Sequence, residues 1–183
     1  NNGCKGVASA TIVVRNAPVI TVSPYNPKIC HGDSVTLIAT GAVLYDWTPA
    51  TGLNTNVGNI VISSPDSTIT YTVAGVDLYG CLGSSNITVT VHPIPTVDFR
   101  ADETDICQAT VVHFTGMASP SIQSWVWDFG DPAAGASNSS SMQNPMHAYF
   151  ETGTYTVGLS VTTTAGCKNS IQKPSYIIVH PNP

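Results

Sequence analysis

Two carboxylates stand close together in the segment WVWDFGD at residues 125–131. Asp128 and Asp131 are three residues apart and follow two tryptophans. A pair of carboxylates beside aromatic side chains is the arrangement that glycoside hydrolysis uses for its general acid and base. Carboxylate oxygens are also the ligands that Ca²⁺ prefers, although a calcium site needs more oxygens than these two residues supply. In a third interpretation, the aromatic side chains are core and the two acids close a turn.

Strand alternation helps to decide between these interpretations. Successive side chains of a strand point to opposite faces, so Trp125 and Trp127 share one face and at least one of them is expected in the core. Asp128 then ends the strand and Gly130 permits a turn, where an aspartate accepts hydrogen bonds from backbone N–H groups. We therefore favour structural acids, predict no catalytic residue, and keep Asp128 and Asp131 as weak calcium candidates.

The composition indicates an all-β protein. Of the 183 residues, 42% are hydrophobic and only 9% are charged. Strand-favouring Thr, Val, Ile and Tyr are frequent, and no stretch repeats its apolar residues at the helical period. The formal net charge of −5, without a basic patch, argues against a nucleic-acid partner. No apolar run approaches the roughly 20 residues of a membrane-spanning helix, so no membrane span is predicted.

The sequence contains internal repeats. The tripeptide GCK at residues 3–5 recurs as GCL at 80–82 and as GCK at 166–168, each followed by an alternating segment and a proline-bearing joint. Upstream of the last two copies, KICHGDSVTLIATG parallels DICQATVVHFTG, LYDWTP parallels WVWDFG, and TYTVAG parallels TYTVGL. Such self-similarity at a regular spacing is the signature of a repeat architecture.

These repeats predict a domain organisation. Residues 1–17 are expected to be the final hairpin of a preceding repeat, residues 18–94 one unit and residues 95–183 the next. Because the chain starts and stops within this series, we predict a fragment of a longer tandem array. Proline fixes φ, so the joints NAP, HPIP and HPNP should be stiff.

Each unit shows short strand-like segments separated by turn residues, at the spacing typical of an antiparallel β-sandwich. The predicted strands are 19–22, 34–39, 43–47, 59–62, 69–75 and 86–91 in the first unit, and 97–100, 110–115, 122–129, 147–150, 154–163 and 175–179 in the second. Trp47, Trp127, Tyr71 and Tyr155 occupy matching positions in the two repeats and are predicted core residues. The two tyrosines are also expected to form tyrosine corners.

The second unit resembles a PKD domain, an Ig-like β-sandwich. The matching motifs are WDFGD at 127–131, NPMHAY at 144–149 and GTYTVGLSVTTTAGC at 153–167, although the loop at 131–143 is longer than the usual turn. The first unit resembles Ig-like repeats in very long secreted proteins of Bacteroidetes, through CHGDSVTL, YDWTPATGLN and TITYTVAGVDLYGC. Such chains resemble adhesins, including those that the type IX system exports in gliding bacteria.

Five cysteines in an extracellular β-protein suggest disulfides. Pairing within the units would join Cys30 to Cys81 and Cys107 to Cys167. In an Ig-like sandwich, however, these partners would lie at opposite poles, about 20–30 Å apart, whereas a disulfide needs Cα atoms within about 7 Å. We therefore favour a Cys30–Cys167 bond across the joint at 92–95 and leave both pairings within the units open. The other three cysteines would then pair outside this chain.

The tripeptides DSV at 33–35 and DST at 66–68 resemble the O-glycosylation motif of Bacteroidetes, which makes Ser34 and Ser67 candidate acceptors. Asp-Ser is also common at turns before strands, and this alternative stays open. No Ser-His-Asp or Cys-His set and no glycine-rich phosphate loop is recognisable. We therefore predict no cofactor.

The sequence thus predicts a non-enzymatic structural segment of a long extracellular repeat protein that forms a surface filament, stalk or adhesin. Its partners would be neighbouring repeats of the same chain, with lateral copies in a filament and a surface or polysaccharide ligand as further candidates. The alternative is an accessory substrate- or carbohydrate-binding module of a secreted hydrolase, which predicts an exposed line of aromatic rings. Tyr25, Tyr45 and Tyr79 are its candidates, although Tyr45 also fits the core. In both cases we expect a cell-surface or secreted protein.

Overall fold

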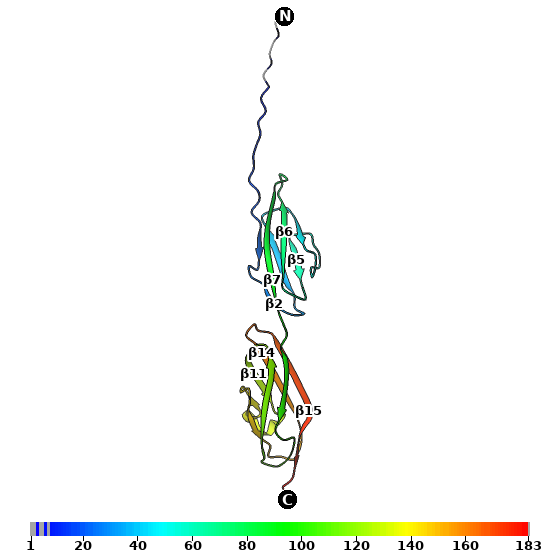
Figure 1. Cartoon of the computed structure of the whole chain (residues 1–183), viewed down its shortest axis with the longest axis vertical. Coiled ribbons are helices and arrows are strands. Elements are labelled where there is room, and N and C mark those ends of the chain that lie inside the picture. Colours follow the sequence, from blue (N-terminus) through cyan, green and yellow to red (C-terminus); the bar gives the residue numbers. More distant parts are fainter. Residues whose placement is uncertain (1–2, 4–5, 7, 183) are drawn as a thin grey trace. The chain divides into compact units, whose positions relative to one another are not determined.

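The computed structural model of the chain describes Gly3, Gly6 and residues 8–182. These residues are mostly strands and turns, and the fold is all-β (Figure 1). The chain divides into two compact units, residues 1–91 and residues 92–183. Each unit is described by itself.

The first unit contains two sheets. Its strands are β1 (Thr21–Ser23), β2 (Lys28–Cys30), β3 (Val35–Thr40), β4 (Leu44–Thr48), β5 (Ile60–Ser63), β6 (Ile69–Val76) and β7 (Leu82–His92). Strand order is β1-β3-β5 in one sheet and β2-β7-β6-β4 in the other. The β4–β6 and β6–β7 pairs are antiparallel, as are both pairs of the smaller sheet.

The second unit repeats this plan with a larger second sheet. Its strands are β8 (Thr96–Ala101), β9 (Asp105–Cys107), β10 (Val111–Ser119), β11 (Ile122–Asp128), β12 (Ser139–Ser140), β13 (Met146–Ala148), β14 (Gly153–Thr163) and β15 (Lys168–His180). Strand order is β13-β10-β8 and β12-β11-β14-β15-β9. The β15–β9 pair is parallel. A 3₁₀ helix, η1 (Pro132–Asn138), follows β11.

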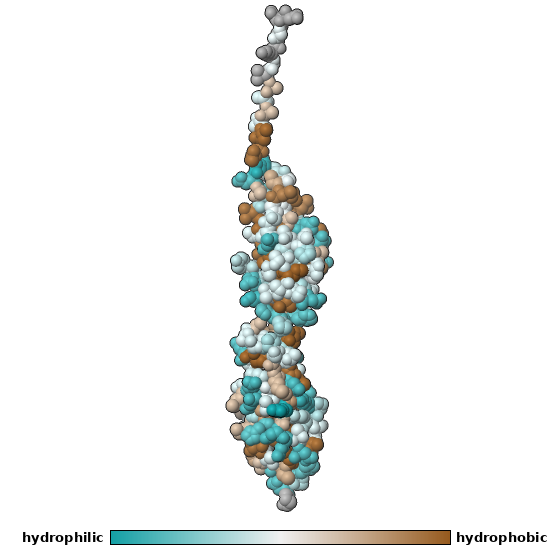
Figure 2. Space-filling model, in the orientation of Figure 1, coloured by the Kyte–Doolittle hydropathy of each residue, from teal (hydrophilic) through white to brown (hydrophobic). Residues whose placement is uncertain are grey.

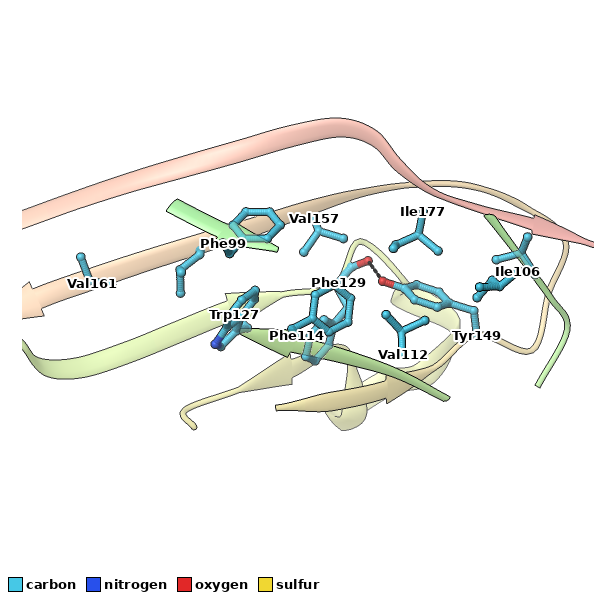
Figure 3. Close-up of a cluster of buried hydrophobic side chains, with 12 residues drawn as sticks. Phe99, Ile106, Val112, Phe114, Trp127, Phe129, Tyr149, Val157, Val161 and Ile177 are labelled. Carbon is cyan, nitrogen blue, oxygen red and sulfur yellow. Dashed lines mark hydrogen bonds between the residues drawn. The ribbon is translucent and has the colours of Figure 1, made fainter. Parts of the chain in front are cut away.

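Strand alternation builds one core in each unit. On the face that Figure 2 shows, hydrophobic surface is broken into small areas among hydrophilic ones. The buried apolar side chains instead lie between the sheets, and in the second unit the rings of Phe99, Phe114, Trp127 and Phe129 gather there (Figure 3). Trp127 contacts Phe99 edge-on and lies 5.5 Å from Phe114 between ring centroids. The first unit is built around Trp47, which is fully buried.

Every strand predicted from the sequence overlaps an observed strand. Three short strands were not predicted, namely β2, β9 and β12, because two or three residues carry no readable alternation. The final strand of the second unit was predicted at 175–179 but extends over 168–180. It contains an irregularity after Lys173, where Pro174 removes a ladder donor and Ser175 has a φ of +50°.

The segment before β1 pairs with no strand. Residues 8–20 adopt no regular secondary structure, and Ile12, Val13 and Val14 are all largely exposed. The prediction that residues 1–17 are the final hairpin of another repeat stays a prediction, and Cys4 lies outside the described residues. Within the described part of the chain, no helix combines the length and apolar character required to cross a bilayer.

Candidate functional site

β11 carries the tryptophans and leads into the acidic turn. Trp127 is fully buried, and its indole Nε1–H donates to the carbonyl oxygen of Met142 at 2.8 Å. Trp125, on the same face, packs partly buried at the margin of the core. Val126 between them points outward and is 57% exposed. The two rings therefore form part of the packing between sheets and present no aromatic platform beside the acids.

Asp128 serves the turn that follows the strand. Its Oδ1 accepts hydrogen bonds from the backbone N–H of Gly130 at 2.9 Å and from the side-chain Nδ2 of Asn138 at 3.1 Å. Gly130 has a φ of +70°, and a Cβ at this position would lie 2.2 Å from the carbonyl oxygen of Thr156. The tight turn therefore requires glycine at this place.

Asp131 turns into the protein, unlike Asp128. Both Asp131 and His147 are buried, and Asp131 Oδ2 lies 3.1 Å from His147 Nε2. The imidazole of His147 stacks on the ring of Phe129 at 4.5 Å between centroids and meets the edge of Tyr149. Because burying an unpaired polar group is costly, the acid and the histidine satisfy each other inside the unit. The sequence analysis missed this pair, although His147 and Tyr149 alternate as two residues of one strand face.

This arrangement supports neither a hydrolytic nor a calcium site. The two carboxylates have different partners, one in a solvent-facing turn and one against a buried imidazole. Among the residues that the structure describes, no group of three or more His, Cys, Asp or Glu side chains is placed to hold a metal ion. Asp128 closes the turn that links β11 to η1, and Asp131 pairs with His147 inside the unit.

The tyrosines of the second unit differ in burial from the sequence expectation. Tyr155, predicted as core, is only partly buried, and its hydroxyl donates to the carbonyl oxygen of Glu151 at 2.7 Å. Tyr149 is fully buried instead and donates to the carbonyl oxygen of Phe129 at 3.0 Å. Burial, followed by the nearby charge of Asp131, raises the pKa of Tyr149. Burial is likewise the main cause that raises the pKa of Tyr155.

Tyr71, by contrast, is fully buried in the first unit. Its hydroxyl donates to the carbonyl oxygen of Thr51 at 2.7 Å and accepts from Ser63 Oγ at 3.1 Å. The hydroxyl therefore contacts a backbone group 20 residues upstream, whereas a tyrosine corner reaches only a few residues back. Tyr155, whose partner Glu151 lies four residues upstream, has the contact expected of such a corner.

A basic side chain crosses the sheet margin at the irregularity in β15. Lys173 Nζ lies 2.8 Å from Asp98 Oδ1 and also donates to the carbonyl oxygen of Phe99. It sits over the rings of Phe99 and Tyr176, at 4.6 and 5.2 Å from their centroids. The hydrogen bond from Lys173 is the main cause that lowers the pKa of Asp98. This contact was not predicted from the sequence, because it depends on an irregularity in the β14–β15 pairing, where Tyr155 faces Ile177 but Val157 faces Lys173.

The aromatic line required of a carbohydrate-binding module is not formed by its candidates. Tyr45 is buried in the core of the first unit, and its hydroxyl is bonded to the backbone of Ala42. Tyr79 is exposed, but the guanidinium carbon of Arg15 lies 3.5 Å from the centroid of its ring. Tyr25 is exposed. The candidates therefore do not act together as a flat aromatic surface.

The second unit does have a cavity of about 520 Å³ beside the buried pair. It lies between the η1–β12 segment and the edge strand β13, and its lining includes Phe129, Met146, His147 and Phe150. Three serines contribute hydroxyl groups, namely Ser137, Ser139 and Ser140. This mixture of apolar and hydroxyl groups is typical of a concave site for a small ligand.

The predicted glycosylation acceptors are both accessible. Ser34 and Ser67 are exposed and lie in loops, directly before β3 and shortly before β6. Their modification stays a prediction.

The cysteines occur in two oxidation states. Cys30 and Cys167 are disulfide-bonded, whereas Cys81 and Cys107 have free thiols. Neither of the alternatives considered from the sequence, Cys30–Cys81 and Cys107–Cys167, is therefore formed, in keeping with the distance argument from strand topology.

Cys30 and Cys107 occupy the same place in their units. The backbone N–H of the residue three positions later donates to the carbonyl oxygen of each cysteine, at 2.9 Å from Asp33 and 3.3 Å from Thr110. Cys107 lies opposite His180, the last residue of β15, in the parallel pair. In the first unit, β2 lies next to β7, which ends at His92. Both cysteines therefore lie at what we call the downstream pole, where the last strand of the unit ends.

Cys81 and Cys167 also occupy equivalent places, in the turn that connects the last two long strands. The carbonyl oxygen of Cys81 accepts from the N–H of Asp77, and its own N–H donates to Asp77 Oδ1. Cys167 makes the same two contacts with Thr163, through a hydroxyl in place of the carboxylate. A glycine precedes each cysteine with positive φ, Gly80 at +80° and Gly166 at +88°.

These turns lie where the chain enters each unit, at what we call the upstream pole. Asn169, two residues after Cys167, donates from Nδ2 to the carbonyl oxygen of Pro95 at 2.8 Å. Gly83, two residues after Cys81, lies so close to Pro18 that a Cβ would stand 2.1 Å from the Pro18 carbonyl oxygen. Each unit therefore carries one cysteine at its upstream pole and one at its downstream pole.

Comparison with known proteins agrees with this fold. Residues 92–179 match the PKD domain family. The PKD1 domain of Vibrio anguillarum Epp is 24% identical and covers 48% of this chain and 96% of its own, with a TM-score of 0.38. The PKD1 domain of the Vibrio cholerae metalloprotease PrtV is 25% identical over 46% of this chain and 98% of its own, also with a TM-score of 0.38.

A longer solved structure covers both units. Extracellular domains 3–5 of Drosophila OTK are 10% identical, with a TM-score of 0.51, and the match covers 90% of this chain and 62% of that one. At this identity the likeness concerns the fold alone. The comparison with curated proteins gives no match.

Proposed function

We propose that the chain is a non-enzymatic structural segment of a long extracellular repeat protein, which forms a surface filament, stalk or adhesin. The observation that carries this proposal is the matched pair of poles. Both units have a cysteine turn beside the proline at which the chain enters and a second cysteine beside the end of the last strand. A unit that carries an equivalent cysteine at each of its two poles is suited to head-to-tail assembly.

The proposed mechanism includes a covalent staple between the units. Cys30 is at the downstream pole of the first unit, and Cys167 is at the upstream pole of the second. Both are disulfide-bonded, and only the short joint at 92–95 separates the two poles along the chain. A Cys30–Cys167 bond would limit rotation about this joint, which suits a chain that bears tension.

The proposed location outside the cell rests on the same chemistry. Disulfides persist in secreted and cell-surface proteins and are rare in the cytosol. The PKD match agrees with an extracellular or surface protein. More specifically, the sequence motifs favour a Bacteroidetes adhesin exported by the type IX system, with glycans on Ser34 and Ser67.

The alternative is an accessory binding module of a secreted hydrolase. The cavity beside Phe129 and Phe150 favours it, because apolar and hydroxyl groups together suit a sugar ring. The burial of Tyr45 in the core argues against it, as does the guanidinium of Arg15 over one face of the otherwise exposed Tyr79 ring.

Electron microscopy of the parent protein from the cell-surface or secreted fraction, labelled with an antibody raised against this chain, separates the two functions. Long beaded filaments with label along their length are the expected result. A compact particle with one globular catalytic head and a single label beside it would overturn the structural proposal and favour the accessory module.

A further inference from the structure

We infer that Cys81 and Cys107 form disulfides with cysteines of further Ig-like units. In each such bond, the cysteine at the downstream pole of one unit pairs with the turn cysteine of the unit that follows it. The inference rests on the proposed function, because it assigns the partners of the repeat array. It specifies which kind of cysteine each free thiol pairs with. Cys107 should form a disulfide with the cysteine in the turn between the last two strands of a following unit. Cys81 should form a disulfide with a cysteine of a preceding unit that is placed like Cys30.

The first step is the structural equivalence of the free and the bonded cysteines. Cys107 shares with Cys30 the three-residue turn that follows it and a place in the short strand beside the last strand of its unit. Cys81 shares with Cys167 both contacts to the residue four positions earlier. The same local backbone therefore presents each sulfur at the same pole of its own unit.

The second step is the difference in oxidation state. The downstream cysteine of the first unit and the upstream cysteine of the second are bonded, whereas the two at the opposite poles are free. This is the pattern expected when each bond joins a downstream pole to the next upstream pole. The two thiols that stay free are Cys81 at an upstream pole and Cys107 at a downstream pole. In successive copies of the chain, these two could pair by the same rule.

The third step is access to the free thiols. Cys107 is exposed and Cys81 is partly exposed. Neither thiol is enclosed in the cores of its unit. Both thiols can therefore react with a cysteine of another unit while their own units stay folded.

The chemistry is a two-electron oxidation. Two thiols lose two protons and two electrons as the S–S bond forms, and a disulfide oxidant such as oxidised glutathione takes them and becomes two thiols. The exchange proceeds through a mixed disulfide at one of the two cysteines. A partner held at the joint then displaces glutathione, because tethering raises the effective thiol concentration to about the millimolar range.

A tandem duplication tests the inference with the full chain. Residues 1–183 are followed directly by residues 19–183, so that His180-Pro181-Asn182-Pro183 precedes the second copy as His92-Pro93-Ile94-Pro95 precedes the second unit. Cys4 is replaced by Ser to remove its thiol. After folding in a glutathione buffer, unreduced peptides are mapped by mass spectrometry, and free thiols are counted by alkylation. The single chain with Cys4→Ser is the reference.

The expected map contains Cys107 of the first copy linked to Cys81 of the second copy, besides a Cys30–Cys167 link in each copy. The matched control is the duplication with Cys107→Ser in the first copy only, in which Cys81 of the second copy should become free to alkylation. If both Cys30–Cys167 links form while Cys107 and the second Cys81 stay free, the inference is overturned and the proposed staple stands. If no Cys30–Cys167 link forms, the staple itself fails.

A mixing experiment tests the direction without a tether. Chains with Cys4→Ser/Cys81→Ser are mixed with chains with Cys4→Ser/Cys107→Ser, and disulfide-linked dimers are counted. The inference predicts dimers between unlike chains, through Cys107 and Cys81, at least about tenfold above dimers of like chains. Dimers in statistical proportion would show random oxidation of exposed thiols and would contradict it.

Discussion

At the scale of single residues, a few side chains and one glycine build the aromatic core of the second unit and the turn after β11. The pair of acids that resembles a catalytic site is divided between a turn and the interior. Asp128 bonds the backbone of Gly130, while Asp131 is buried against His147. The aromatic rings that precede them are packed against Phe99 and Phe114. The segment WVWDFGD therefore serves the fold: Asp128 stabilises the tight turn that ends the strand, and Asp131 pairs with a buried histidine.

Replacing Trp127 by Ala should strongly destabilise the second unit. The side chain is fully buried and bonded to the carbonyl oxygen of Met142, so truncation leaves a cavity and an orphaned acceptor. We expect a loss of about 3–5 kcal/mol in the free energy of unfolding, measured by urea denaturation. Val126→Thr on the exposed face should change it by less than about 0.5 kcal/mol. Equal losses for both variants would contradict the assignment of the core face.

Replacing Gly130 by Ala should destabilise the same unit through a backbone contact. Gly130 and Gly135 both have positive φ, but a Cβ at Gly130 would meet Thr156 at 2.2 Å, whereas nothing lies within 4 Å of a Cβ at Gly135. Gly135→Ala therefore carries a backbone conformational cost without a steric contact, because glycine alone readily adopts its φ of +57° and ψ of −122°. Thermal unfolding should show a clearly larger loss for Gly130→Ala, and a loss no greater than that of the control would refute the close approach.

At the scale of elements, the repeats and alternation in the sequence were sufficient to predict the strands that form both sheets. The same rules could not find β2, β9 and β12, because so few residues have no period. Nor could they place Lys173, since Pro174 interrupts the alternation and moves the register of β15 against β14. The pairing of Asp131 with His147 was missed for another reason, as it depends on where a loop of 13 residues, 131–143, returns the chain. Interactions that depend on register offsets or long loops arise from the tertiary fold.

The contact between β8 and β15 should give the second unit a small acid-dependent stability. The hydrogen bond from Lys173 lowers the pKa of Asp98 below its ordinary value of 3.8. The ionised carboxylate therefore stabilises the fold above that value, and the contribution is lost as the pH falls through the lower pKa of the folded state. The effect should be below about 1 kcal/mol, because Asp98 is more than half exposed.

Urea denaturation between pH 5 and about pH 2 measures this contribution. Asp98→Asn should flatten the dependence at its acid end. Lys173→Met, with Asp98 intact, should remove the same step, since the lysine is the main cause of the lowered pKa. An unchanged acid limb in both variants would disprove the proposed contribution of this pair.

At the scale of the whole molecule, the two units share a plan for their ends. The turn cysteine beside Pro18 or Pro95 and the cysteine beside the last strand recur, although the sheets differ in size. The repeat of the GC motif predicted this correspondence from the sequence. Topology places the two cysteines of one unit at opposite poles, and the proposed bonds between units rest on this placement.

Loss of the proposed staple should expose the joint to proteases. With Cys30→Ser/Cys167→Ser, the proposed covalent restraint on rotation about residues 92–95 is removed and the two prolines of the joint remain. Limited proteolysis should then cleave at the joint faster than in the unchanged chain, with both units left intact. Cys81→Ser is the matched control and should be cleaved at the unchanged rate. An identical rate for all three proteins would show that the disulfide does not restrain the joint.

The central claim is that the disulfide joins neighbouring units, and a map of unreduced peptides from the native chain tests it most directly. Digestion under conditions that prevent exchange, followed by mass spectrometry, identifies the partner of each cysteine. We expect one linked peptide pair that contains Cys30 and Cys167, with Cys81 and Cys107 recovered as alkylated thiols. A link from Cys30 to Cys81, or from Cys107 to Cys167, would contradict it.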